Sequence, residues 1–184
     1  MKNIAVICDL DGLLVDSEPL HFRAYREVLG QFGLEITKEN FIESWLSGKH
    51  YGTTAYLHKV GITDPVEIAA VRAQKSDKFI ELATGILHLM PGVQEFLDVL
   101  EEAGIPCAVG TGGHGKEYNF TKKECGLERI KVWVGGDDVE KNKPAPDIFL
   151  KAASDLGVQP EDCIVFENSD IGLSSAISGG MKSV

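Results

Sequence analysis

The chain has 184 residues, of which 43% are hydrophobic and 25% are charged. This composition is typical of a folded globular protein and excludes collagen-like, mucin-like and low-complexity classes. The 28 acidic side chains outnumber the 18 basic ones, and the formal net charge of −10 argues against a protein that binds the nucleic-acid backbone. At this length we expect one domain, with or without an inserted subdomain.

The N-terminal apolar run, Ile4–Cys8, is too short for a signal peptide, and no run approaches the length of a membrane span. The four cysteines, at positions 8, 107, 125 and 163, contain no C-x-x-C pair, and three lie in or beside apolar strand-like segments. This pattern favours reduced thiols. We therefore expect a cytoplasmic protein, a monomer, with no nucleic-acid and no membrane partner.

Four apolar segments are each followed by turn-forming and then helix-like sequence. They predict strands at Ile4–Cys8, Ile105–Val109, Ile130–Val134 and Cys163–Phe166. Repeated strand–helix order indicates an α/β protein with a Rossmann-like, doubly wound parallel sheet. About 95 residues separate the first two strands, which is far more than one crossover connection requires.

That long interval has the periodicity of helices. Apolar spacing predicts them over Pro19–Leu29, Lys38–Leu46, Tyr51–Val60 and Pro65–Leu82. Asp64 is the expected N-cap of the last one, with Pro65 at its first position. We predict an inserted helical cap at residues 17–87 and a core made of residues 1–16 and 88–184, in which Val93–Leu100 is a helix.

The C-terminal sequence is less regular. Gly179 and Gly180 end a helix that starts near Ile171, and Met181–Val184 resembles the approach to a further strand that the sequence does not complete. Either the sheet is small, or the natural domain is longer than this sequence.

Polar residues follow every predicted strand. They are Asp9, Asp11 and Gly12 after the first strand, Thr111, Gly112 and Gly113 after the second, Lys141 and Lys143 in the turn-rich segment after the third, and Glu167, Asn168, Ser169 and Asp170 after the fourth. In open parallel sheets, ligands bind beyond the carboxyl ends of the strands, so we expect these positions to converge.

A convergent set of this kind suits phosphoryl transfer. Asp9, Asp11 and Glu167 would repel one another unless a cation lay among them. Mg²⁺ meets that need with few protein carboxylates, waters and a substrate phosphate, and Lys143 adds positive charge. The Thr111 hydroxyl and the amides of the following glycine pair would hold phosphate oxygens. One aspartate would then attack phosphorus while the other transfers protons.

Four sequence segments, in this order, resemble the motifs of the haloacid dehalogenase superfamily. They are DLDGLLVDSE from Asp9 to Glu18, Thr111 after CAVG, Lys143 in NKPAPDIF, and FENS from Phe166 to Ser169. The resemblance is greatest to the branch that contains β-phosphoglucomutase and small sugar-phosphate phosphatases. It implies a Mg²⁺-dependent enzyme with a helical cap and an aspartyl-phosphate intermediate.

The resemblance also implies roles for individual residues. Asp9 would be the nucleophile, Asp11 the acid and base, and Thr111 and Lys143 the phosphate ligands. Asp9 and Asp11 would hold the metal together with Glu167 and Asn168. The substrate would be a small phosphorylated metabolite.

Asn168 departs from the family pattern, because most members of this branch have aspartate at this position. An amide oxygen still faces a hard cation but brings no charge, so we expect weaker Mg²⁺ binding. Asp170 either compensates through water or is a helix residue favoured by the helix dipole. A substitution that traps a complex is a third reading, and the sequence does not separate the three.

Several other residues are candidates for substrate contact. They are Gly112 and Gly113 through their amides, His21 and Lys75 in the cap helices, His50 in the loop between cap helices, and His114 after the glycine pair. Each of these side chains has an ordinary structural alternative, namely a helix-surface or solvated position.

The choice between phosphatase and mutase depends on whether residues are present that bind the distal phosphate of the substrate. The β-phosphoglucomutase pattern has an arginine in the cap loop and a lysine after the second motif. The matching segments here, GKHYGT and TGGHGK, contain no arginine, and a histidine follows the glycine pair. This difference favours water as the acceptor and thus a phosphomonoester hydrolase. A β-phosphoglucomutase-like mutase and a metabolite-binding protein of low turnover remain the alternatives.

Overall fold

The computed structural model describes residues 4–47 and 52–184, and the chain divides into two compact units. One unit comprises Met1–Asp16 with Leu87–Val184, and the other is the contiguous segment Ser17–Ile86. The first unit contains a parallel sheet of five strands with helices on both faces, and the described part of the second is helical. The predicted α/β class with a Rossmann-like sheet is therefore confirmed.

The sheet has the strand order β3-β2-β1-β4-β5, and every pairing is parallel. The strands are β1 (Ala5–Cys8), β2 (Cys107–Gly110), β3 (Val132–Val134), β4 (Cys163–Phe166) and β5 (Lys182–Ser183). Cys8 at the end of β1 lies opposite Val109 of β2 and Phe166 of β4. Because the strands end at one level, the residues that follow β1, β2 and β4 meet at one edge of the sheet.

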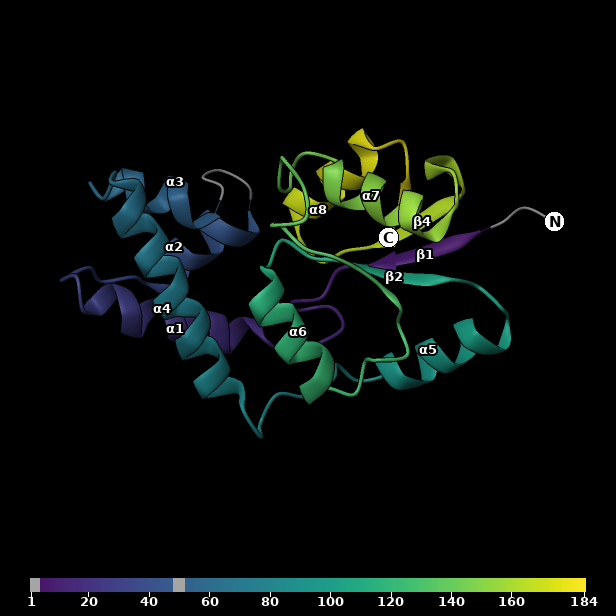
Figure 1. Cartoon of the computed structure of the whole chain (residues 1–184), viewed down its shortest axis with the longest axis horizontal. Coiled ribbons are helices and arrows are strands. Elements are labelled where there is room, and N and C mark those ends of the chain that lie inside the picture. The colour runs from purple at the N-terminus through teal and green to yellow at the C-terminus, as the bar shows by residue number, and fades with distance from the viewer. Residues whose placement is uncertain (1–3, 48–51) are drawn as a thin grey trace. The chain divides into compact units, whose positions relative to one another are not determined.

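Helices cover both faces of this sheet (Figure 1). The helices α7 (Asp147–Leu156) and α8 (Asp170–Ser178) lie on one face, and α5 (Val93–Glu102) and α6 (Gly115–Glu124) lie on the other. A short 3₁₀ helix, η2 (Pro160–Asp162), precedes β4.

Close packing of α7 on β2 depends on a glycine. The side chains of Ile148 and Phe149 are fully buried, and a Cβ atom built on Gly110 would lie 2.9 Å from the Phe149 ring. Only a residue without a side chain allows this contact. The approach matters for the site because α7 follows directly on the loop that carries Lys143.

The helical unit has its own apolar core. It is built from α1 (Glu18–Gly30), α2 (Lys38–Phe41), the π-helix η1 (Ile42–Leu46), α3 (Gly52–Lys59) and α4 (Pro65–Ala83). Leu29, Phe41, Leu57 and Val71 are buried in one cluster within it. The Asp64 side chain accepts a hydrogen bond from the Val66 amide at 2.8 Å, which confirms the predicted N-cap of α4.

Two predictions about elements need correction. The single helix expected over Lys38–Leu46 is an α-helical turn that widens into η1, where the Ser47 amide donates to the Ile42 carbonyl at 2.9 Å. The C-terminal residues do form a strand, because the Val184 amide donates to the Val165 carbonyl at 2.9 Å and β5 pairs with β4. No helix within the described ranges is long and apolar enough to cross a membrane.

Candidate active site

The turn after β1 presents two aspartates. The Asp9 amide donates to the Phe166 carbonyl of β4 at 2.9 Å, which keeps Asp9 in line with the sheet. Gly12 then turns the chain with a φ of 75°, and its amide donates to the Val15 carbonyl at 2.9 Å. The carboxyl group of Asp9 is buried, with 10% of its side chain exposed, whereas Asp11 is half-buried.

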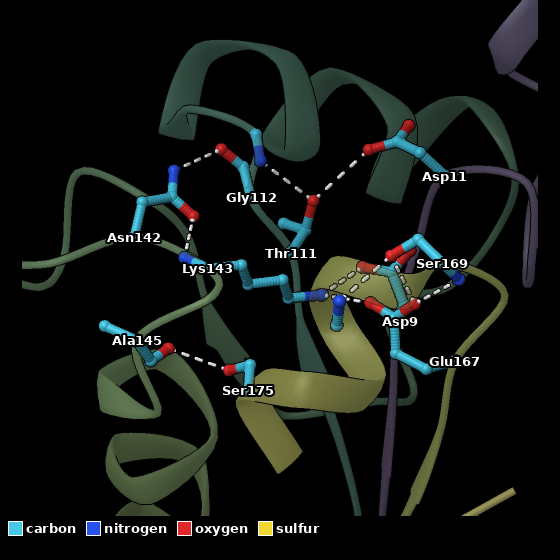
Figure 2. Close-up of polar contacts among 12 residues, drawn as sticks. Asp9, Asp11, Thr111, Gly112, Asn142, Lys143, Ala145, Glu167, Ser169 and Ser175 are labelled. Carbon is cyan, nitrogen blue, oxygen red and sulfur yellow. Dashed lines mark hydrogen bonds and ion pairs between the residues drawn. The ribbon is translucent and has the colours of Figure 1, made fainter. Parts of the chain in front are cut away.

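Lys143 joins this turn to the end of β4 (Figure 2). Its Nζ atom donates to Asp9 Oδ1 and to Glu167 Oε1, both at 2.7 Å, and lies 4.6 Å from the centroid of the Phe149 ring. The side chains of Lys143 and Glu167 are 8% and 1% exposed. A buried ammonium ion shared by two carboxylates is held firmly, because moving it would leave buried charges unpaired.

Glu167 is fixed on its other side by the start of α8. Its Oε2 atom accepts hydrogen bonds from the Ser169 amide at 2.7 Å and from the Ser169 hydroxyl at 2.8 Å. The helix approaches so closely that a Cβ atom on Gly172 would overlap the Glu167 carboxylate. Both oxygens of Glu167 are thus engaged by protein donors, and in this arrangement the residue positions Lys143.

We expect Gly172→Ala to push Glu167 away from Lys143, since the added methyl group occupies the place of the carboxylate. Overpacking of this kind costs about 1–3 kcal/mol of unfolding free energy. Urea unfolding measures this loss, and phosphate release measures the effect on the site. Gly30→Ala is the matched control, because no atom lies within 4 Å of the added methyl. Equal stability of the two variants would contradict the packing argument.

Thr111 connects the end of β2 to the aspartate turn. Its hydroxyl donates to Asp11 Oδ2 at 3.2 Å and accepts from the Gly113 amide at 3.0 Å (Figure 2). The residue is buried, and its own amide donates to the Val134 carbonyl of β3 at 2.9 Å. Four segments that are distant in sequence therefore bring two bonded groups of side chains to one edge of the sheet, Asp9–Lys143–Glu167 and Asp11–Thr111.

The electrostatics of the network are unusual at Asp9. Burial raises the pKa of this carboxyl to about 7, with the charges of Glu167 and Asp11 acting in the same direction and Lys143 acting against them. For Lys143, burial lowers the pKa, but the adjacent carboxylates outweigh burial and raise it above its ordinary value. The site holds more negative charge than one lysine neutralises.

This excess of negative charge, together with the types of donor atoms, fits a divalent cation. Across residues 4–47 and 52–184 there is no cluster of three His, Cys, Asp or Glu side chains that would hold a metal alone. Mg²⁺ does not require one, since it uses one or two carboxylates and completes its shell with water and substrate phosphate. Asp9 offers a carboxylate, and the exposed Asn168 beyond β4 offers an amide oxygen.

The other predicted substrate contacts fall into three groups. In the sheet unit, the Gly112 carbonyl accepts from the Asn142 side chain at 2.9 Å, and His114 Nδ1 lies 3.9 Å from an Asp137 carboxylate oxygen. In the helical unit, Lys75 and His21 are both buried, with Lys75 Nζ 2.8 Å from His21 Nδ1. His50 lies outside the described residues.

Three residues of the site were not predicted from the sequence. They are Asn142 and Ser175, which hold the lysine loop, and Gly172, which makes room for Glu167. Asn142 had one indication, its position directly before Lys143. Gly172 had one as well, because a glycine inside a predicted helix is unfavourable and suggests close packing, whereas nothing in the sequence distinguishes Ser175 from an ordinary helix residue.

The family model of haloacid dehalogenase-like hydrolases matches residues 5–180. The chain belongs to this family. The predicted superfamily is therefore confirmed, and so is the prediction that the protein is a hydrolase. The match spans both the sheet unit and the helical insertion.

Relatives of this hydrolase include two bacterial phosphatases. The phosphorylated carbohydrates phosphatase of Thermotoga maritima is 32% identical over 98% of this chain and 83% of its own length. The fructose-1-phosphate phosphatase of Escherichia coli is 32% identical over 97% of this chain and 94% of its own. A mutant of CbbY from Rhodobacter sphaeroides, solved with xylulose-(1,5)bisphosphate, superposes with a TM-score of 0.86 at 28% identity, over 100% of this chain and 85% of that one.

Proposed function

We propose that this hydrolase releases phosphate from a small phosphorylated sugar or related metabolite, with Mg²⁺ as its cofactor and an aspartyl-phosphate intermediate. The observation that carries the proposal is the buried Asp9–Lys143–Glu167 network beside Thr111 at the carboxyl edge of the sheet. Relatives that act on phosphorylated carbohydrates and on fructose 1-phosphate support the same substrate class.

The reaction requires two carboxylates with different roles. A carboxylate oxygen of Asp9 attacks phosphorus, the ester P–O bond breaks, and Asp11 gives its proton to the departing oxygen. Asp11 then takes a proton from water, whose oxygen attacks phosphorus, and the bond to Asp9 breaks to release phosphate. Lys143 and the Thr111 hydroxyl stabilise the charge on the phosphoryl oxygens during both steps.

Asp9, Asp11 and Asn168 are the residues that would hold Mg²⁺, with Glu167 behind them. When bound, the metal ion would neutralise phosphoryl charge and relieve the repulsion among the carboxylates. Glu167 fixes Lys143 next to Asp9. The Lys143 ammonium group would therefore contact both the nucleophile and the phosphate.

Phosphate release from a panel of small phosphomonoesters, with and without Mg²⁺, tests the proposal. We expect Mg²⁺-dependent release from at least one sugar phosphate. A β-glucose 1-phosphate sample should be followed for sugar isomers at the same time, because isomerisation without phosphate release would establish the mutase instead. Folded protein that binds sugar phosphates and turns none of them over would establish the binding protein.

Titration of Asp9 provides a test of the metal site that does not depend on turnover. Without metal, the pKa of Asp9 is raised to about 7. A bound cation favours the ionised carboxylate, so Mg²⁺ should move the titration midpoint to lower pH, and protons should weaken Mg²⁺ binding below this pKa. Carboxyl ¹³C resonances measure the midpoint, and K⁺ at equal ionic strength is the control. A midpoint that Mg²⁺ leaves in place would argue against a metal at Asp9.

Asn168→Asp should bind Mg²⁺ about tenfold more tightly, because it replaces a neutral amide oxygen by a charged ligand. The Mg²⁺ concentration that gives half-maximal phosphate release measures the change. Asn119→Asp adds the same charge on the exposed surface of α6 and should leave that concentration unaltered. If both variants behave alike, the gain comes from net charge and Asn168 is not a ligand.

A further inference from the structure

Asn142 bridges two loops of the site that come from different strands (Figure 2). Its Nδ2 atom donates to the Gly112 carbonyl at 2.9 Å, and its Oδ1 atom accepts from the Lys143 amide at 2.7 Å. The Asn142 carbonyl also accepts from the Ala145 amide at 3.1 Å and so closes a turn around Lys143. One side chain thus contacts both the glycine loop after β2 and the backbone of the lysine.

The bond to Gly112 has a consequence for Thr111. The Gly112 carbonyl and the Gly113 N–H belong to one planar peptide unit, so holding the carbonyl also fixes the direction of the N–H. That N–H donates to the Thr111 hydroxyl at 3.0 Å, and the hydroxyl in turn donates to Asp11 at 3.2 Å. Asn142 is therefore linked to the Thr111 hydroxyl through one peptide unit and bonded directly to the backbone of Lys143.

The surrounding residues leave space for this side chain. A Cβ atom on Gly136 would collide with Asn142 Nδ2 and would lie 2.7 Å from the Gly112 carbonyl oxygen. The Gly136 amide donates to the Gly113 carbonyl at 2.8 Å, which ties the loop after β3 into the same arrangement. On the other side of Lys143, the buried Ser175 hydroxyl donates to the Ala145 carbonyl at 2.7 Å.

We propose that Asn142 is a positioning residue that sets the affinity of the site for a phosphoryl group, by holding Thr111 and Lys143 at a fixed separation. This inference deepens the proposed function and rests on it for the identity of the ligand. Asn142 itself does not enter the chemistry. It acts through the two groups that would contact phosphoryl oxygens, so its loss should weaken phosphate binding and slow the reaction together.

Two variants of Asn142 test whether its side-chain hydrogen bonds support phosphate binding. Asn142→Ala removes both side-chain hydrogen bonds, whereas Asn142→Asp keeps the shape and the acceptor for the Lys143 amide but cannot donate to Gly112. Lys141→Ala is the control on the same loop, because the Lys141 side chain is exposed and the bond from Lys141 to Asp147 Oδ2 at 3.3 Å comes from the backbone amide. Calorimetry with inorganic phosphate in the presence of Mg²⁺ measures affinity, and steady-state kinetics separates kcat from KM.

We expect both Asn142 variants to bind phosphate about tenfold more weakly and to lower kcat/KM through kcat as well as KM, with thermal unfolding close to that of the parent. Phosphate affinity within twofold of the parent in both variants would overturn the inference, and so would a loss explained by unfolding alone. A parent that binds no phosphate overturns it too. A parent that binds phosphate through Asn142 but hydrolyses no ester would leave this inference standing and remove the proposed function.

Discussion

Asp9→Asn should lower kcat for phosphate release at least about a thousandfold, because an amide oxygen is not a nucleophile towards phosphorus. The shape of the side chain is conserved, and the amide oxygen still accepts the hydrogen bond from Lys143 Nζ, which Asp9 Oδ1 accepts at 2.7 Å. Single-turnover and steady-state phosphate release measure the loss. The same variant should still bind the substrate, which equilibrium binding detects.

The stability of Asp9→Asn is informative as well. Burial penalises the charged form of Asp9, since it raises the pKa of this carboxyl to about 7. At a pH above this value the neutral amide should therefore be at least as stable as the parent. Asp155→Asn, an exposed change on α7, is the control for removal of one negative charge. An Asp9→Asn protein that retains more than a tenth of the parent rate would require another nucleophile.

Lys143→Met should affect both stability and activity. The variant leaves Asp9 and Glu167 buried side by side without their shared ammonium group, and breaking a buried ion pair in this way costs about 3–5 kcal/mol. Loss of the positive charge also removes stabilisation of the phosphoryl oxygens, for which we expect a fall in kcat of about a hundredfold or more. Urea unfolding and phosphate release measure the two effects.

The pH dependence of that destabilisation has a definite sign. Lys143 lowers the pKa of Asp9, so its removal should raise this pKa from about 7 to a higher value. As the pH falls through this raised pKa, Asp9 becomes neutral. The difference in unfolding free energy between the parent and Lys143→Met should therefore become smaller. The double variant Asp9→Asn with Lys143→Met should recover part of the stability above pH 7, because only one unpaired charge remains. Lys141→Met is the control, and equal stability of the two single variants would disprove the account.

Much of the fold and of the site could be predicted from the sequence, because parallel α/β sheets follow simple physical rules. Buried parallel strands are continuous apolar runs, and their carboxyl ends meet, so Asp9, Thr111 and Glu167 could be placed together without coordinates. The direction in which Glu167 points could not be predicted. It depends on how closely α8 approaches at Gly172, which is a property of packing and not of residue spacing.

Asn142 shows the same limit. Its bond to Gly112 spans 30 residues in sequence and forms only once the loops after β2 and β3 are placed by the sheet. The break of the Lys38–Leu46 helix into a π-helical turn is also set by local hydrogen bonding that apolar periodicity does not record. Periodicity predicts which face of an element is buried, whereas bonds between loops depend on tertiary structure.

The helical unit, Ser17–Ile86, is continuous in sequence and packs on a core of its own, while Asp9, Thr111, Lys143 and Glu167 all belong to the other unit. The chain enters and leaves this insertion at one place, where the Asp16 amide donates to the His88 carbonyl at 3.1 Å. Insertions joined in this way can be exchanged or accumulate mutations without disturbing the host fold. Evolution can therefore diversify the insertion while selection preserves the host unit, and laboratory recombination of insertions between relatives offers a direct way to exploit this modularity.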